Sequence, residues 1–288
     1  MANDILQSNS DASRRLRTTI RFMLANLEGF DDKERLPAEQ MPELERFILA
    51  KLAEIDPLVR DSYRVYDFNR AYNTVFSFCT NELSAFYFDI RKDALYCDAR
   101  TATRRRAART AIDEVFRRVV TWLAPILCFT MEEAWLLRFP GADESVHLQL
   151  FPETPKDWRD DALIQKWDRI RTLRRVVTGA LEIKRRDKVI GASLEARPVL
   201  YVTDPKDAAL FDDLDLGEIA ITSNARVSTH AAPSDVFALP EIPGVMAEFH
   251  HAEGDKCARC WMILPEVGKN PAHEDLCNRC SEAVDASA

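Results

Sequence analysis

The chain has 288 residues, 47% of them hydrophobic, which is enough to bury more than one core. Its 15 Phe and 5 Trp exclude a collagen, a coiled-coil rod and a disordered tail. The 8 glycines form neither G-x-G-x-x-G nor G-x-x-x-x-G-K-S/T, so no loop that cradles a nucleotide phosphate is predicted. The lack of a long apolar run and of a signal-peptide pattern predicts a soluble, cytoplasmic protein that does not contact membranes.

The net charge of −8 is distributed unevenly along the chain. Nine Lys and Arg stand against four Asp and Glu in residues 91–118, and nine against three in residues 166–188. Residues 204–255 instead hold two basic and eleven acidic side chains. Two basic surfaces could therefore meet a polyanion such as nucleic acid while the acidic segment faces away. The alternative interpretation is that these basic residues form ordinary solvated helix faces.

The first 140 residues are predicted to be helical, because apolar residues recur there at spacings of three and four. Ser10 or Ser13 is expected to cap the first helix, and Gly29 to end it. The second helix is expected to start at Pro42 and to bend or break at Pro57. Long amphipathic helices with short connections predict an antiparallel bundle.

Three more helices are predicted in this part of the chain. Asp67 is expected to cap a strongly apolar helix, and Thr101 or Thr103 to open the next one. Thr130 and Glu133 form the pattern of a capping box for a short third one. The helix that opens at Thr101 or Thr103 carries arginines that are expected to be exposed, namely Arg104, Arg105, Arg106, Arg109, Arg117 and Arg118.

The sequence pattern changes in the second half of the chain. A linker punctuated by Pro and Gly precedes a long helix from about Asp160 to Arg186. Beyond Gly191, the segments ARPVLYVTD, EIAITS, RVSTH and DVFALP are rich in β-formers, and DAALFDDLDL between them is expected to be one helix. This pattern predicts a small α/β domain.

The strongest motif consists of two C-x-x-C pairs near the end of the chain. Cys257 and Cys260 form the first pair and, after sixteen intervening residues, Cys277 and Cys280 form the second. Each pair presents two sulfurs to one ion, and two such pairs complete a closed tetrahedron, which is typical of a structural zinc ribbon. We therefore expect these four cysteines to bind one structural zinc ion. A closed site of this kind stabilises a small module and does no Lewis-acid chemistry.

Other interpretations of the cysteines and of their neighbours fit less well. Disulfides or a redox C-x-x-C disagree with a reducing compartment and with the lack of a thioredoxin-like βαβ setting. Three nearby histidines are possible ligands, but four cysteines already fill the coordination shell. Cys79 and Cys128 stand among apolar residues and are expected to lie in the core.

The predicted fold class is mainly α, with an antiparallel helix bundle, a small α/β junction domain and a terminal four-cysteine zinc ribbon. The predicted parts are residues 1–140 (bundle), 141–158 (linker), 159–252 (long helix with the α/β domain) and 253–288 (zinc module).

Cations and an aromatic residue surround the predicted metal site. Lys256 and Arg259 flank Cys257, and Trp261 directly follows Cys260. An aromatic face for a base beside charges for phosphates is what recognition of single-stranded RNA requires. The alternative, in which Trp261 covers the metal as part of a miniature core, stays equally open. The arginines expected to contact RNA phosphates are Arg104, Arg105, Arg106 and Arg109.

No catalytic constellation is apparent. The sequence holds neither a nucleophile elbow nor H-E-x-x-H, and the paired aspartates stand in predicted loops or caps. We therefore predict no catalytic residues, and expect this chain by itself to be inactive as an enzyme.

Several segments together resemble a known family. RRLRTTIRFMLANL, WLAPILCFTMEEAW and DFNRAYNTVFSFCTNELSAFYFDIRKDALYCD are similar to helices of the class I anticodon-binding bundle. LEIKRRDKVIGASLEARPVLYV and DKCARCWMI, followed by LCNRC, are similar to a junction segment and a terminal zinc module. From about residue 10 to 284, the chain resembles the C-terminal part of a bacterial isoleucyl-tRNA synthetase, a class I aminoacyl-tRNA synthetase.

This resemblance implies a function. The chain would hold the anticodon loop and stem of tRNA(Ile), while the parent enzyme ligates isoleucine to that tRNA with ATP. Motifs like H-I-G-H and K-M-S-K-S are absent, so the chain is expected to be a fragment without the catalytic and editing domains, and ATP to bind only in the missing catalytic domain. The parent is expected to be a monomer with no obligate protein partner.

Two alternatives belong to other classes. One is a free-standing, zinc-containing RNA-binding or adaptor module. The other is a DNA glycosylase of the formamidopyrimidine type, which ends in a similar finger but uses an N-terminal proline amine, whereas this chain begins Met-Ala-Asn.

Overall fold

A computed structural model gives the structure of the chain, and it describes residues 2–141 and 143–286. Most of these residues are helical, which confirms the predicted fold class. None of the helices in the described part is long and apolar enough to cross a membrane.

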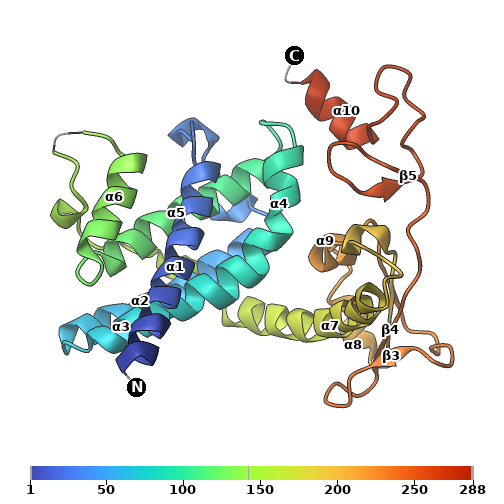
Figure 1. Ribbon diagram of the computed structural model, residues 1–288, viewed down its shortest axis with the longest axis horizontal. Coiled ribbons are helices and arrows are strands. Elements are labelled where there is room, and N and C mark those ends of the chain that lie inside the picture. Colours follow the sequence, from blue (N-terminus) through green and yellow to red (C-terminus); the bar gives the residue numbers. More distant parts are fainter. Residues whose placement is uncertain (1, 142, 287–288) are drawn as a thin grey trace. The chain divides into compact units, whose positions relative to one another are not determined.

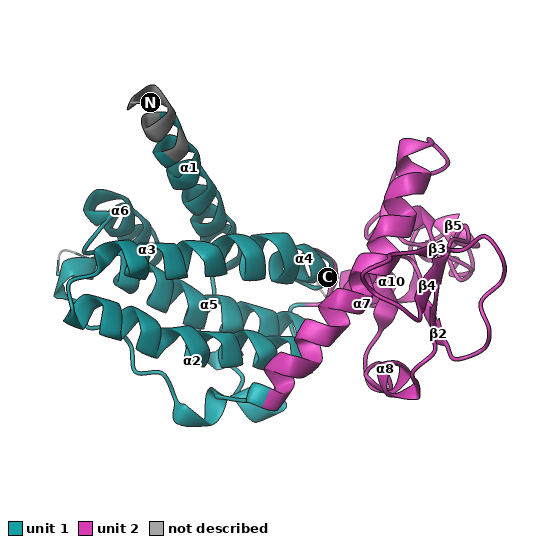
Figure 2. Ribbon diagram, turned by 90° about the horizontal axis from the view of Figure 1, so that it is seen from below, with its two compact units in different colours: residues 1–95, 100–161 teal, residues 96–99, 162–288 magenta. Residues whose placement is uncertain are grey.

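The chain divides into two compact units (Figure 2). The first contains residues 1–95 and 100–161, and the second contains residues 96–99 and 162–288. The four residues 96–99 thus belong to the second unit although they are far from the rest of it in the sequence.

The first unit is a bundle of helices around α5 (Figure 1). Most of α5 is buried from Ala107 to Leu123, so it is the central helix of the unit. The helices are α1 (Ala2–Asn26), α2 (Glu43–Arg64), α3 (Phe68–Ser77), α4 (Phe88–Cys97), α5 (Thr103–Leu123) and α6 (Cys128–Arg138). Short 3₁₀ turns connect them at Asp32–Glu34, Ala38–Gln40, Val146–Leu148 and Lys156–Trp158.

Only some of the helix ends that the sequence predicts in this unit are found in the structure. The Asp67 carboxylate accepts from the backbone N–H of Arg70 at 3.0 Å and caps α3, as predicted. Gly29 follows α1 with a positive φ of 63°, as expected of a terminating glycine. Ser10 and Ser13, by contrast, lie inside α1, which begins upstream of both, so the predicted cap was wrong.

Of the two effects expected of Pro57, a bend or a break, the break is absent, because α2 runs as one helix from Glu43 to Arg64. The buried side chains Leu52 and Val59 lie before and after the proline, so packing outweighs the loss of one backbone hydrogen bond. The capping box at Thr130 is absent as well, because α6 already starts at Cys128.

The segment between α3 and α4 is a π-helix, Phe78–Tyr87, labelled η3. It continues directly into both neighbours, so residues 68–97 follow one helical path. Its buried side chains include Phe78, Leu83 and Tyr87, spaced by five and by four residues. This wider repeat keeps the large side chains of the segment on the core side.

The second unit begins with the long helix α7 (Asp161–Arg186), close to the predicted bounds. A four-stranded sheet follows in the order β2-β1-β4-β3. β1 runs parallel to β2, and β4 pairs antiparallel with both β1 and β3. The strands are β1 (Val199–Val202), β2 (Arg226–Ser228), β3 (Phe237–Ala238) and β4 (Val245–Glu248).

The connection from β1 to β2 differs from the prediction. DAALFDDLDL does not form one helix, and EIAITS is not a strand. Two short helices occupy this stretch instead, α8 (Pro205–Ala209) and α9 (Leu216–Ala220). Asp204 and Asp215 start them, because their carboxylates accept from the backbone N–H of Lys206 at 2.9 Å and of Gly217 at 2.7 Å.

Candidate metal centre

The four predicted cysteines meet in one place. The first pair stands in the turn between β5 (Asp255–Lys256) and β6 (Ile263–Leu264), and the second at the start of α10 (Asn278–Asp285). All four side chains are buried, and their sulfurs lie within 4.8 Å of one another. The two pairs approach closely, with 3.8 Å between the Sγ atoms of Cys260 and Cys277.

Backbone hydrogen bonds shape the first turn. The N–H of Trp261 donates to the carbonyl of Cys257, and the N–H of Cys257 donates to the carbonyl of Met262, both at 2.9 Å. Trp261 itself has a positive φ of 66°, which closes the turn back onto β6. Gly254 has φ of 111°, and a Cβ there would lie 2.3 Å from the carbonyl of Leu264. Only glycine therefore allows the two strands of this hairpin to approach as they do.

The thiols of the cluster differ in proton affinity. Burial raises the pKa of Cys257, but hydrogen bonds from the backbone N–H groups of Cys260 and Cys277 outweigh it and lower the pKa to about 6. The pKa of Cys260 is raised well above its ordinary value by the hydrogen bond with the Cys280 thiol and by burial. Four thiolates this close would repel one another unless a cation lay between them. The donor set therefore fits one structural zinc ion, which takes four thiolates in a closed tetrahedron.

The histidines near the cluster have other partners. The ring of His273 contacts the carboxylate of Asp285 at 2.8 Å, and the ring of His250 contacts Glu248 at 3.2 Å. Among the described residues, the group with metal-binding geometry contains cysteines alone.

A small apolar core surrounds the sulfurs, and it includes a fifth cysteine. Val267 is buried there, with Met262 and Leu264 packed against it. Cys97, from the four-residue segment 96–99, is 7% exposed in the same cluster. No sequence motif links Cys97 to the metal site, because Cys97 stands 160 residues before Cys257. Cys128, expected in the core, is exposed, so that prediction was wrong.

An arginine precedes the second cysteine of each pair, and both arginines bind segment 96–99. The guanidinium of Arg259 donates to the carbonyl of Tyr96 at 3.1 Å and to the carbonyl of Cys97. The guanidinium of Arg279 donates to the Asp98 carboxylate at 3.1 Å. Arg259 was expected to contact RNA, but in the structure its guanidinium donates to backbone carbonyls of the second unit.

Trp261 lies outside this core. Its side chain is 62% exposed, and the ammonium of Lys256 lies 5.6 Å from the centre of its ring. Met262 and Leu264, rather than Trp261, cover the sulfurs. Of the two interpretations left open by the sequence, this geometry favours an aromatic face available to a ligand.

The arginines of α5 are less available than their spacing suggested. Arg104 pairs with Asp93 at 3.0 Å, and Arg106 donates to the carbonyl of Glu34 at 3.1 Å. Arg105 donates to the carbonyl of Leu95 at 3.2 Å.

Two arginines of α5 that were expected to be exposed are buried. Arg109 is 4% exposed and donates to the carbonyls of Asn26 and Glu28. Arg118 is 2% exposed and donates to the carbonyl of Glu153 at 2.6 Å. The prediction of exposure was wrong because α5 is surrounded by other elements, so that even its polar side chains face protein.

Comparison with known proteins defines the class. Residues 45–200 match the family described as the anticodon-binding domain of tRNA ligase, and residues 254–283 match a zinc finger found in FPG and IleRS. The chain belongs to the family of anticodon-binding domains of tRNA ligases. A DNA glycosylase would share the finger alone, whereas here the tRNA-ligase domain precedes it.

Three relatives with high sequence identity to the chain are isoleucine–tRNA ligases. The chain is 55% identical over 98% of its length to an isoleucine–tRNA ligase of Ruegeria pomeroyi. It is 48% identical over 99% of its length to that of Brucella abortus and 46% identical over 97% to that of Caulobacter vibrioides. The chain spans 29% of the length of each of these relatives.

Proposed function

We propose that the chain binds the anticodon loop and stem of tRNA(Ile) as part of an isoleucine–tRNA ligase. The observation that carries this proposal is the exposed Trp261 on a zinc finger that accompanies a tRNA-ligase anticodon-binding domain. Ligation of isoleucine with ATP then belongs to parts of the relatives outside the matched 29%. The 288 residues alone neither form isoleucyl-adenylate nor charge tRNA. We place the ligase in the cytoplasm, as a monomer without an obligate protein partner.

The metal has a structural role in this proposal. Cys257, Cys260, Cys277 and Cys280 bind one zinc ion and leave no position for water, so the ion holds the fold and does no chemistry on the substrate. Residues 253–288 form a module that depends on the metal. The bundle within residues 1–140 keeps its own core, and residues 141–158 link it to the part that begins at 159.

We assign recognition of the RNA bases to the exposed ring of Trp261, beside the metal site. Bases of an anticodon loop expose their faces and their Watson–Crick edges, so one of them stacks on Trp261 while Lys256 meets a phosphate. Arg259 supports this contact by holding the turn that carries Trp261. Arg104, Arg105 and Arg106 remain candidates for contacts with phosphates, because each is partly exposed. The buried Arg109 would need to leave its present acceptors to take part.

Replacing the indole tests this assignment. Trp261→Ala is expected to weaken binding of a tRNA(Ile) transcript by roughly tenfold to a hundredfold, because one base–aromatic stack is worth about 1–3 kcal/mol. The measurement is the dissociation constant from fluorescence anisotropy at fixed salt. Zinc content and thermal melting should stay unchanged, since Trp261 is outside the core of the module.

Trp261→Phe is the matched variant, because it keeps an aromatic face and should retain most of the affinity. Loss of zinc together with affinity in Trp261→Ala would instead show that the indole covers the metal. Full affinity in a folded, zinc-loaded Trp261→Ala protein would refute the assigned contact.

A further inference from the structure

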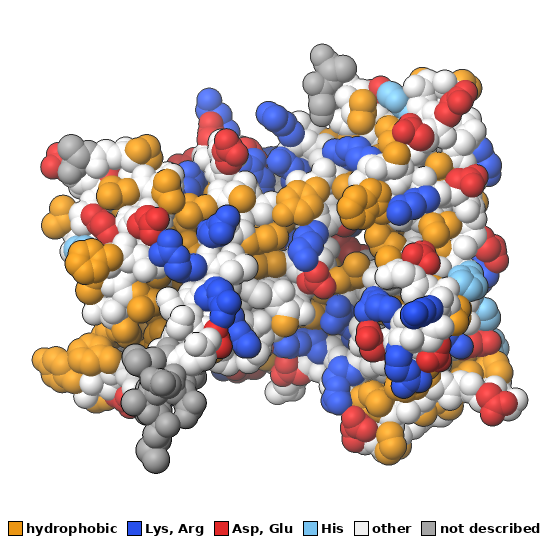
Figure 3. All heavy atoms as spheres, viewed as in Figure 1, with side chains coloured by type: hydrophobic (Ala, Val, Ile, Leu, Met, Phe, Trp, Pro, Cys, Tyr) orange, Lys and Arg blue, Asp and Glu red, His pale blue; other side chains and the backbone are white. Residues whose placement is uncertain are grey.

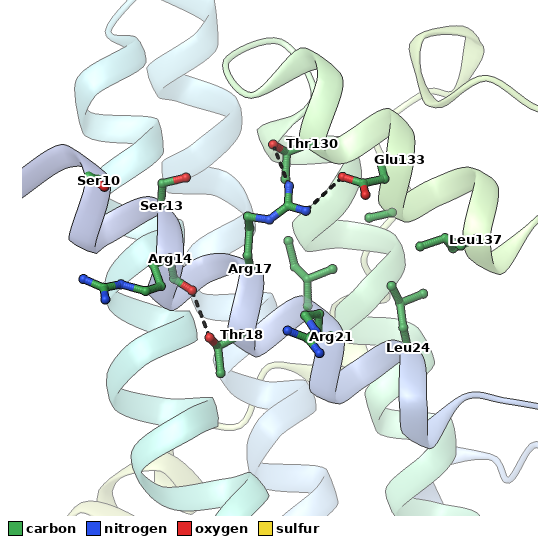
Figure 4. A pocket seen from close by; sticks show the side chains of 12 residues that line it. Ser10, Ser13, Arg14, Arg17, Thr18, Arg21, Leu24, Thr130, Glu133 and Leu137 are labelled. Atoms are coloured by element: carbon green, nitrogen blue, oxygen red, sulfur yellow. Dashed lines mark hydrogen bonds and ion pairs between the residues drawn. The ribbon is translucent and has the colours of Figure 1, made fainter.

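An open groove of about 640 Å³ lies between α1 and α6 in the first unit (Figure 4). Seven of its twelve lining residues carry a hydroxyl or a guanidinium group, one carries a carboxylate, and the others are apolar. α1 contributes Arg14, Arg17 and Arg21 to this lining, and α6 contributes Thr130, Glu133 and Leu137.

The helical repeat gathers the α1 arginines of this groove on one side of the helix. Arg14, Arg17 and Arg21 are spaced by three and four residues, which places them on one face. The opposite face carries Leu16 and Met23, which are 1% and 0% exposed in the core. At a rise of about 1.5 Å per residue the three arginines cover about 10 Å along the axis. Basic side chains along α1 are visible at the surface in Figure 3.

Arg17 is held in place between the two helices. Its guanidinium donates to the Glu133 carboxylate at 3.1 Å and lies 3.5 Å from the Thr130 hydroxyl. Figure 4 shows the side chain pointing from α1 toward these two residues of α6. The single carboxylate of the groove is thereby engaged, and Arg17 still has 46% of its side chain exposed.

The other two arginines are available to a ligand. Arg21 is exposed and has no hydrogen bond or ion pair with any residue that the structure describes. Arg14 extends away from α6 at the rim, and among the described residues it pairs only with Asp11; the two side chains are 72% and 42% exposed. An ion pair this exposed is worth little, so an incoming anion can replace it. The lining residues therefore carry an excess of two positive charges, which becomes one when the Asp11 partner of Arg14 is counted.

We propose that this groove binds the sugar–phosphate backbone of the tRNA, a contact that rests on the proposed function. Guanidinium and hydroxyl groups are the usual donors to phosphate oxygens, and a row of about 10 Å can meet more than one phosphate of a strand. The arginines of α5 are largely engaged by the protein, whereas on α1 Arg21 has no hydrogen bond or ion pair with a described residue and Arg14 makes one exposed pair with Asp11. Leu24 and Leu137 at the edge would suit a protein partner, but charged groups are depleted where protein interfaces are buried.

Removing the two available charges tests the groove. In the double variant Arg14→Gln/Arg21→Gln, the slope of log affinity against log salt should become shallower by about 0.7 to 0.9 for each arginine. At about 0.1 M monovalent salt this amounts to roughly 25- to 60-fold weaker binding of a tRNA(Ile) transcript. The measurement is a salt titration of the dissociation constant by anisotropy. Arg15→Gln is the matched control, because Arg15 is exposed on the same helix but does not line the groove.

The outcomes separate the two proposals. Binding by Arg14→Lys/Arg21→Lys with the wild-type slope would support phosphate contacts, since an ammonium supplies the same charge. If the double Gln variant keeps the slope of Arg15→Gln while the wild-type chain binds tRNA, the groove proposal is wrong and the proposed function stands. If the wild-type chain itself shows no salt-dependent binding to tRNA, both the proposed function and the groove proposal are wrong.

Discussion

Removal of zinc by a chelator is expected to unfold residues 254–283 while the helices of the first unit stay folded. The apolar core around the four sulfurs is small, with Val267 as its one buried aliphatic member among the described residues. Structural zinc contributes about 10–16 kcal/mol in comparable modules, far more than this core can supply. Hydrogen exchange followed by mass spectrometry measures both regions in one experiment, because it reports protection peptide by peptide.

Cys277→Ser should have the same local effect, since it removes one of the four thiolates. Cys128→Ser is the matched control, because Cys128 is exposed and lies outside the cluster. Protection of segment 96–99 should fall together with that of the module, since Arg259 and Arg279 bind it. An ordered module after complete loss of metal would show that zinc is not what holds it.

Glu45→Ala is expected to destabilise the first unit by about 3–5 kcal/mol, because it removes the carboxylate that balances the buried guanidinium of Arg91. The Glu45 carboxylate accepts from Arg91 at 2.5 Å and from the Tyr87 hydroxyl at 3.0 Å. The side chains of Glu45 and Arg91 are 0% and 3% exposed, so water cannot replace the missing partner. The free energy of unfolding from urea titration is the quantity to measure.

The control for this prediction is Asp61→Ala, which breaks an ion pair with Arg64 whose side chains are 55% and 75% exposed. It should change stability by less than about 1 kcal/mol. The double variant Glu45→Met/Arg91→Met should recover much of the loss, because neither charge is then buried alone. Equal effects of Glu45→Ala and Asp61→Ala would contradict this account of the buried pair.

Features set by short-range patterns could be predicted from the sequence. Two C-x-x-C pairs sixteen residues apart predict one metal cluster, because each turn is closed by its own backbone. The cap at Asp67 and the long helix α7 follow from local residue preferences in the same way.

Features that depend on distant residues could not be predicted. Arg259 and Cys97 meet across 162 positions, and no local signal links them. Helical spacing also cannot tell a charged face in water from one against other helices, which is why the burial of Arg109 was missed. The same holds for Pro57, whose effect on α2 is decided by packing on both sides.

The helical path of residues 78–87 was predicted but its π form was not, and the structure between β1 and β2 was predicted wrongly. A 3.6-residue period was assumed for residues 78–87, and the chain uses a wider one. The β-formers in EIAITS are outweighed by the cap at Asp215, which starts α9 in that stretch. Capping by one carboxylate and burial of Leu216 and Ile219 decide the local structure there.

We propose that this chain recognises the anticodon end of tRNA(Ile). The most direct measurement compares the affinity of the zinc-loaded chain for the anticodon stem–loop of tRNA(Ile) with its affinity for the same stem–loop carrying substituted anticodon bases. Phosphate contacts are the same in both RNAs, so any difference comes from the bases. The account predicts tighter binding of the native loop, by about 1–3 kcal/mol, and loss of that preference in Trp261→Ala. Equal affinity for the two loops, with the wild-type chain folded and zinc bound, would contradict it.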